Sequence, residues 1–143
     1  MNKQIGIIER CNALYRSAQF KELGIGGYQH SYIIAICNNP GISQDEIAKR
    51  IHVNKSNVTR HVCCLEEGGF VRREDNPKDK RSFVVYPTEK ALEIKPKILQ
   101  ILREWDNRLT EFLTDEEKNF LNDILVRVAE KSLEVVGDLT WTL

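Results

Sequence analysis

Residues 43–87 have the sequence SQDEIAKRIHVNKSNVTRHVCCLEEGGFVRREDNPKDKRSFVVYP, and the helix and strand signals within them decide the fold. Ser43 and Glu46 have the spacing of a capping box, in which each side chain bonds the backbone N–H of the other residue. Ile47 and Ile51, four residues apart, mark the buried side of the helix that follows. The pattern predicts a short helix that begins directly after Ser43.

A second helix is predicted after a tight turn at His52 and Val53. Asn54 is a favourable N-cap, and the two glycines after Glu67 end the helix. At about 100° per residue, one side of this helix is apolar and is expected to pack inward: Val58, Val62 and Leu65. The opposite side carries Ser56, Asn57, Thr59, Arg60 and Cys63.

Two strands and a basic loop follow these helices. Residues 70–74 and 82–86 are rich in aromatic and β-branched side chains, and the polar residues 75–81 between them have the composition of a hairpin loop. The loop tip carries Lys78, Lys80 and Arg81. We expect the carboxylate of Asp79 to hold the guanidinium of Arg81, two residues on, by a charge-assisted bond.

Helical patterns flank this stretch on both sides. Apolar residues at helical spacing predict a first helix: Ile7, Cys11, Leu14 and Ala18. Residues 28–37 predict another, with Tyr32, Ile33, Ile36 and Cys37 turned inward. Thr88 is expected to cap a long helix kinked at Pro96, and residues 114–117 form a second capping box. The expected fold class is mainly α with a small two- or three-stranded β wing.

Length and composition are those of one globular domain. The chain has 143 residues, of which 41% are hydrophobic and 29% charged. No apolar run approaches the ~20 residues that span a membrane, and the apolar stretch after Met1 is too short and too interrupted by charge for a signal peptide. We therefore expect one domain, residues 1–143, located in the cytoplasm and without membrane contact.

The net charge is zero, but the charges are unevenly distributed. Residues 49–81 hold nine basic and five acidic side chains, whereas residues 104–143 hold four basic and ten acidic ones. A basic centre beside an acidic C-terminal arm is consistent with a centre that binds nucleic acid. Solvated helix faces of both signs would give the same totals.

The remaining polar residues indicate no catalytic or metal site. The sequence contains no nucleophile–base constellation, glycine-rich phosphate loop or metal box, so we expect neither an enzyme nor a cofactor. The three histidines lack metal-ligand spacing: His30, His52 and His61. The cysteines form no C-x-x-C pair, and we expect free thiols at Cys11, Cys37, Cys63 and Cys64.

Two short helices joined by a tight turn and followed by a basic hairpin are the arrangement that places a helix in the major groove of DNA. Arginine, asparagine and hydroxyl side chains suit base edges, and the loop cations suit the adjacent minor groove. A solvated polar helix with a charged turn, or a winged helix that binds another protein, would use the same pattern. The expected DNA-binding residues are Asn54, Lys55, Ser56, Asn57, Thr59, Arg60, Arg73, Lys78, Asp79, Lys80 and Arg81.

The stretch from Ile42 to Ala91 resembles the MarR (multiple antibiotic resistance regulator) family of bacterial transcription factors. The matching features are residues 54–60 in the second helix of the pair, residues 65–73 leading into the wing, and residues 79–82 at its tip. The residues after the second strand, Thr88, Glu89 and Lys90, match as well, although the family usually has leucine where Pro87 stands.

The resemblance implies a winged helix-turn-helix lobe at residues 28–87 and a helical dimerisation region at residues 1–23 and 88–143. It also implies a homodimer on a roughly palindromic operator, usually a repressor that a small molecule or an oxidant releases. The residues themselves favour dimerisation, because the outer helices and the tail at 135–143 are more apolar than a free surface needs. A tail tucked into its own domain is the alternative.

The resemblance leaves open two kinds of signal that release the protein from DNA. Cys11 is similar to the first-helix position that holds the reactive cysteine in the family's organic-hydroperoxide-sensing branch, and its alternative is a packed thiol. Family members also bind aromatic or lipophilic acids between the dimerisation helices and the DNA-binding lobe. The candidate residues for such an effector are Tyr15, Tyr32 and Trp105, and ordinary core packing is their alternative.

Overall fold

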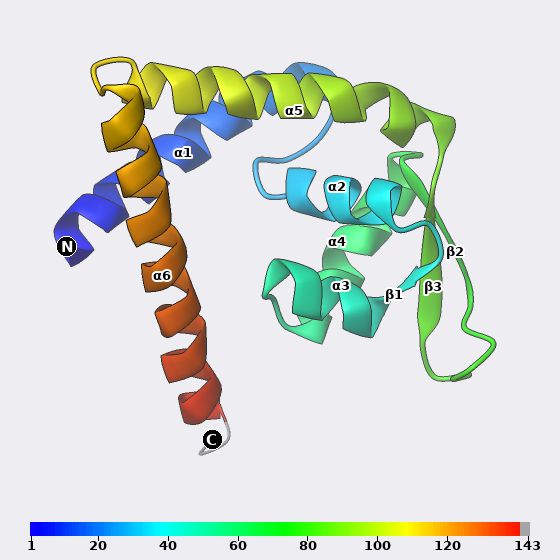
Figure 1. Ribbon diagram of the computed structural model, residues 1–143. Helices are drawn as coiled ribbons and strands as arrows, with labels where there is room; N and C mark the ends of the chain where they lie inside the picture. Colours follow the sequence, from blue (N-terminus) through cyan, green and yellow to red (C-terminus); the bar gives the residue numbers. More distant parts are fainter. Residues whose placement is uncertain (141–143) are drawn as a thin grey trace. The chain divides into compact units, whose positions relative to one another are not determined.

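The computed structural model describes the backbone of residues 1–140 and the side chains of residues 1–137. The chain divides into two compact units, Met1–Leu102 and Arg103–Leu143, and helix α5 crosses the boundary between them. The elements follow one another as α1 (Asn2–Phe20), η1 (Lys21–Leu23), α2 (His30–Asn38), β1 (Ile42–Ser43), α3 (Gln44–Ile51), α4 (Lys55–Glu67), β2 (Val71–Asp75), β3 (Phe83–Pro87), α5 (Glu89–Thr110) and α6 (Asp115–Thr140) (Figure 1). The predicted fold class, mainly helical with a small β wing, is confirmed. Among the described residues, no helix is long and apolar enough to cross a membrane.

The helix-turn-helix is formed by α3 and α4, as predicted. The Glu46 N–H donates to Ser43 Oγ at 3.2 Å, and the Ser43 N–H donates to Glu46 Oε2 at 3.4 Å, which completes the capping box. His52 ends α3 in the left-handed conformation with φ of 56°, so the chain turns within three residues. Figure 1 shows α2, α3 and α4 lying together next to the strands.

The wing is a three-stranded antiparallel sheet in the order β1-β3-β2. Its third strand is the two-residue β1, in which Ile42 pairs with Val85. The two long strands begin one residue later than predicted, because the preceding N–H groups have other partners. Phe70 donates to Leu65 O at 2.9 Å at the end of α4, and Ser82 donates to Asp79 O at 3.1 Å in the wing turn.

The hydrophobic core of the first unit joins helices to the sheet. It consists of Phe20, Ile25, Tyr32, Ile33, Ile36, Ile42, Ile47, Val58, Val62, Leu65, Phe70, Val71, Val85, Ala91, Ile94 and Ile98. Phe20 comes from the end of α1, and the last three residues come from α5. The packing of the lobe therefore extends beyond the residues 28–87 expected for it.

The start of α2 differs from the prediction, whereas that of α5 does not. Helix α2 begins at His30 rather than Tyr28, because Gln29 is held in a turn: its N–H donates to Gly26 O at 3.1 Å, and its Oε1 accepts the Gly26 N–H at 2.8 Å. Helix α5 begins at Glu89, directly after Thr88, whose carbonyl accepts the Leu92 N–H at 3.1 Å. The Thr88 hydroxyl lies 2.6 Å from Gly69 O and 3.0 Å from Phe70 O, to which it donates.

The later helices follow the pattern of the sequence. Helix α5 continues through Pro96. The capping box of α6 is confirmed, with Glu117 N–H donating to Thr114 Oγ1 at 3.2 Å and Thr114 N–H donating to Glu117 Oε2 at 2.9 Å.

The apolar stripe of α1 is exposed rather than packed within the chain. Ile7 is 46% exposed, Leu14 is 74% exposed, and Cys11 is exposed as well. The described part of α6 also presents large apolar side chains to solvent: Phe120, Leu125, Val126, Leu133, Val135 and Val136. Residues 138–143 of the apolar tail lie outside the described side chains.

Candidate nucleic-acid interface

Helix α4 has one buried side and one polar side, as its sequence predicts. Val58 and Val62 are fully buried, and Leu65 is almost so. Their packing fixes the rotation of the helix about its axis. The polar side chains of the second side, Ser56, Thr59 and Arg60 among them, are therefore held toward solvent.

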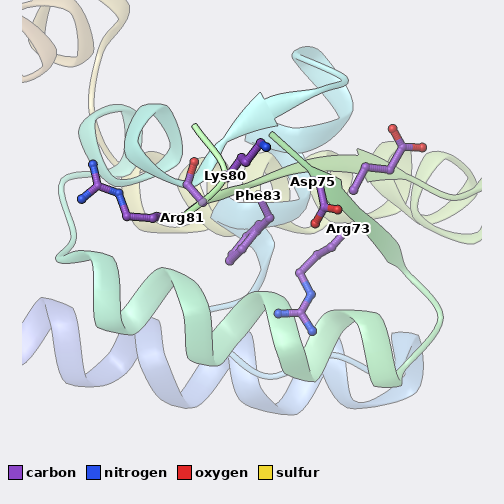
Figure 2. Close-up of a pocket in the computed structure, with 7 residues that line it drawn as sticks. Arg73, Asp75, Lys80, Arg81 and Phe83 are labelled. Atoms are coloured by element: carbon purple, nitrogen blue, oxygen red, sulfur yellow. The ribbon is translucent and has the colours of Figure 1, made fainter. Parts of the chain in front are cut away.

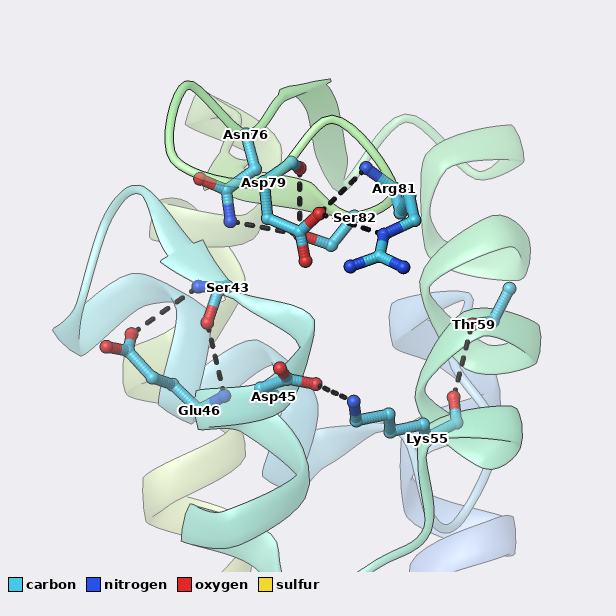
Figure 3. A network of polar contacts seen from close by, with 9 residues as sticks. All are labelled: Ser43, Asp45, Glu46, Lys55, Thr59, Asn76, Asp79, Arg81 and Ser82. Atoms are coloured by element: carbon cyan, nitrogen blue, oxygen red, sulfur yellow. Dashed lines mark hydrogen bonds and ion pairs between the residues drawn. The ribbon is translucent and has the colours of Figure 1, made fainter.

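Asn54 caps α4 and orders the side chains around it. Its Oδ1 accepts the Asn57 N–H at 2.8 Å and the Ser56 hydroxyl at 2.8 Å. Lys55, the first residue of the helix, is paired with Asp45 of α3 through Nζ and Oδ1 at 2.6 Å (Figure 3). The start of α4 is thus tied to α3 by an ion pair as well as by the turn.

The exposed side of α4 carries a second set of internal bonds one turn further on. Arg60 Nη2 donates to Asn57 Oδ1 at 3.0 Å, and the Thr59 hydroxyl donates to Lys55 O at 3.1 Å. These bonds restrict the rotamers of Arg60 and Thr59 before any ligand is present.

The wing tip is an ordered loop with an exposed arginine. Asp79 Oδ1 accepts the Arg81 N–H at 3.0 Å and lies 3.6 Å from Arg81 Nε (Figure 3). The carboxylate therefore holds the backbone of Arg81 by a hydrogen bond and its guanidinium by an ion pair, which extends the predicted role of Asp79. The Arg81 side chain itself is 93% exposed.

Asn76 closes this loop and was not singled out from the sequence. Its Nδ2 donates to Ser82 Oγ at 3.0 Å, and its Oδ1 accepts the Lys78 N–H at 3.0 Å. An asparagine followed by proline at the start of a loop is a recognised turn signal, so the sequence contained the information needed to find it.

Arg73 points back toward α4 instead of out into solvent (Figure 2). Its Nε and Nη2 donate to Glu66 Oε1 at 3.1 and 2.9 Å, and its N–H donates to Glu66 Oε2 at 3.0 Å. The guanidinium also lies over the ring of Phe83, 5.3 Å from its centre. In this structure Arg73 links strand β2 to the end of α4, and the expected contact of Arg73 with DNA stays a prediction.

The side-chain hydrogen bonds from Arg73 hold the pKa of Glu66 below its ordinary value, and burial acts in the opposite direction. Glu66 precedes Arg73 by seven residues, and no local pattern connects a helix end with the following strand at that separation. This pair was therefore missed from the sequence.

A hollow of about 280 Å³ lies beside the Arg73–Glu66 pair. It is lined by Arg73, Glu74, Asp75, Lys80, Arg81, Ser82 and Phe83 (Figure 2).

Glu66→Gln is expected to flatten the acid limb of the stability curve. Because the folded-state pKa of Glu66 is depressed, the pair stabilises the fold above the unfolded value near 4.5, and this contribution disappears as pH falls through the folded value. Thermal unfolding followed at pH 3 to 7 should show a smaller loss of melting temperature for the variant than for the wild type. Glu67→Gln, at the exposed neighbouring position, should behave like the wild type, and parallel curves for all three proteins would contradict the assignment.

The residues expected to sense an oxidant or to bind a small-molecule effector lie in different surroundings. Cys11 is exposed on α1, and Tyr15 on the same helix is half-buried. Tyr32 is buried in the core, where its ring stacks at 4.8 Å on that of His61 from α4. Trp105 is half-buried in the second unit. Among the described residues, no three His, Cys, Asp or Glu side chains lie together as a metal site would require.

These features define a class of protein. The chain has a capped helix pair joined by a tight turn. The second helix exposes its polar side and is followed by a three-stranded basic wing. This arrangement is a winged helix-turn-helix.

The sequence pattern of the MarR family matches residues 28–83. The chain is 31% identical over 136 residues to the HTH-type transcriptional regulator YybA of Bacillus subtilis (strain 168), covering 92% of this chain and 87% of that protein. The chain belongs to the MarR family and is a DNA-binding transcriptional regulator.

Solved structures agree with this assignment. The transcriptional regulator SlyA is 32% identical, with a TM-score of 0.86 over 92% of this chain and 93% of that one. A MarR family transcriptional regulator from Listeria monocytogenes, solved in complex with a 26mer DNA, is 27% identical, with a TM-score of 0.83 over 92% of this chain and 87% of that one.

Proposed function

We propose that the protein is a homodimeric repressor that binds a palindromic operator through α4 and the wing tip. The observation that carries this proposal is that both elements expose cationic and polar groups that their own lobe has already ordered: Arg60 tethered to Asn57, and Arg81 tethered to Asp79. The DNA complex of the Listeria relative supports the same use of the fold.

The proposed roles follow from position. Side chains at the start of α4 contact base edges and nearby phosphates: Asn54, Lys55, Ser56, Asn57, Thr59 and Arg60. Side chains of the wing tip enter the adjacent minor groove or contact its phosphates: Lys78, Lys80 and Arg81. Asp79 orients Arg81, and Arg73 sets the angle between the wing and α4 through Glu66.

The dimer part of the proposal rests on the exposed apolar side chains of the outer helices. Helix α1 exposes Ile7 and Leu14, and α6 exposes Val136 at 55%. Exposed apolar side chains of this kind are costly in water, and a second copy of the chain would cover them. A twofold dimer also explains why an operator would be palindromic, since each copy reads one half-site.

Selection of fragments from the genome that encodes the chain tests the proposal. We expect the protein to enrich a small set of fragments that share an inverted repeat, and to sediment at twice the chain mass of 16.5 kDa. The retained complexes should weaken as salt is raised. If no fragment is enriched at low salt, the winged helix is a protein-interaction module and the proposal is wrong.

The same binding assay addresses the release signal. We propose that an oxidant or a small aromatic acid ends DNA binding, and the exposure of Cys11 supports the oxidant, since a reactive thiol must be reached by peroxide. Peroxide treatment should then abolish binding by the wild type and spare Cys11→Ser. Equal, undiminished binding by both proteins would remove Cys11 from the proposal and leave the small molecule.

A further inference from the structure

The exposed side of α4 contains one arginine whose orientation is set by a neighbour. Arg60 Nη2 donates to Asn57 Oδ1 at 3.0 Å, and residues three apart on a helix are surface neighbours. Within the described residues, no carboxylate lies within ion-pair distance of Arg60. The amide of Asn57 thus positions the guanidinium without neutralising its charge.

The tether leaves a complete pair of donors on Arg60. A guanidinium has five N–H hydrogens and two edges that each offer two parallel donors. Nη2 contributes one hydrogen to each edge, so the bond to Asn57 occupies one edge and leaves the other whole. The free edge is a fixed pair of donors directed away from Asn57.

The two hydroxyl groups of this surface have already used their donors. The Ser56 hydroxyl donates to Asn54 Oδ1, and the Thr59 hydroxyl donates to Lys55 O. The ammonium of Lys55 is paired with Asp45 at 2.6 Å. Ser56 and Thr59 are left with acceptor lone pairs. The amide groups of Asn54 and Asn57 and the ammonium of Lys55 each donate from a single nitrogen, whereas the free edge of Arg60 offers two parallel N–H donors on separate nitrogens.

Guanine is the base that matches a pair of donors. On its major-groove edge it shows two acceptors, N7 and O6, whereas adenine and thymine each show one acceptor and cytosine shows a donor. Building on the proposed function, we infer that each operator half-site contains a guanine read by Arg60, with Asn57 acting as a positioning residue. Asn57 does not itself read adenine, because the oxygen needed for that pairing holds Arg60.

Selection from random duplex DNA, followed by sequencing, tests this inference on three proteins. The wild type should select one nearly invariant guanine in each half-site. For Arg60→Gln, discrimination between guanine and the other bases at that position should fall by about tenfold to a hundredfold. For Asn57→Ala it should fall by about three- to tenfold at the same position, since an untethered arginine loses more rotamer entropy on binding.

Lys55→Gln is the matched control, because it removes one positive charge from the same helix. It should weaken binding to all sequences about equally and leave the guanine preference intact. If Arg60→Gln selects the same guanine as the wild type, or if Asn57→Ala loses an adenine while keeping the guanine, the inference is wrong although DNA binding stands. If the wild type enriches no sequence at all, the proposed function fails and the inference fails with it.

Discussion

Phe20→Ala is expected to lower the free energy of unfolding by about 3–5 kcal/mol, which is a large part of the stability of a domain this size. Phe20 is 0% exposed and lies in the same hydrophobic cluster as the buried residues of α2, α4 and the sheet. Its ring is 5.4 Å from the ring of His30 at the start of α2. Removing it leaves a cavity at the junction between α1 and the DNA-binding lobe.

Urea unfolding monitored by circular dichroism measures this change at a fixed protein concentration. Phe20→Leu is the control, because it retains most of the buried volume and should cost about 1 kcal/mol. A Phe20→Ala protein with the unfolding midpoint of the wild type would show that α1 does not contribute to the core of the lobe.

Arg81→Ala is expected to weaken operator binding by about a hundredfold, since a charge-assisted contact is lost from both wings of a dimer. The side chain is 93% exposed and its backbone is held by Asp79, so the substitution removes a contact to DNA without disturbing the fold. The plot of log affinity against log salt should become shallower by about 1.8, one phosphate for each copy.

Fluorescence anisotropy with a labelled operator at 50 to 200 mM salt gives both quantities. Lys97→Ala removes an exposed cation of α5 and should leave the slope unchanged. If Arg81→Ala keeps the wild-type slope, the wing tip does not contact phosphate, and the cations of α4 carry the electrostatic part of binding.

Several site features could be predicted from the sequence because they depend on neighbours close along the chain. The capping box at Ser43, the N-cap at Asn54 and the pairing of Asp79 with Arg81 all join residues two or three apart. The buried side of α4 follows from the 3.6-residue period in the same way. Local backbone geometry alone brings such residues together, so the sequence pattern is sufficient to predict these contacts.

Features that join distant residues were not predictable in this way. Arginine is a residue type that commonly binds DNA, so Arg73 was expected to do so from the sequence. Only the packing of β2 beside the end of α4 shows that the Arg73 side chain is hydrogen-bonded to Glu66. Phe20 lies within residues 1–23, which were expected to form part of the dimerisation region, yet it is part of the core of the lobe. Strand β1 is two residues long and exists only because β3 lies beside it.

The sequence by itself determined the order of the helices and of the two long strands, the polar side of α4, the basic wing and the membership of the MarR family, because each is encoded by local spacing or by direct similarity. Only the tertiary structure showed that Arg73 is paired with Glu66 and Lys55 with Asp45. Arg81, paired with Asp79 two residues away, and Arg60, tethered to Asn57 three residues away, are held by close neighbours instead. The physical reason is that packing of the core decides which surfaces come within hydrogen-bonding distance of each other, and therefore which partner a charged side chain finds. Residues far apart in sequence meet only in the folded chain.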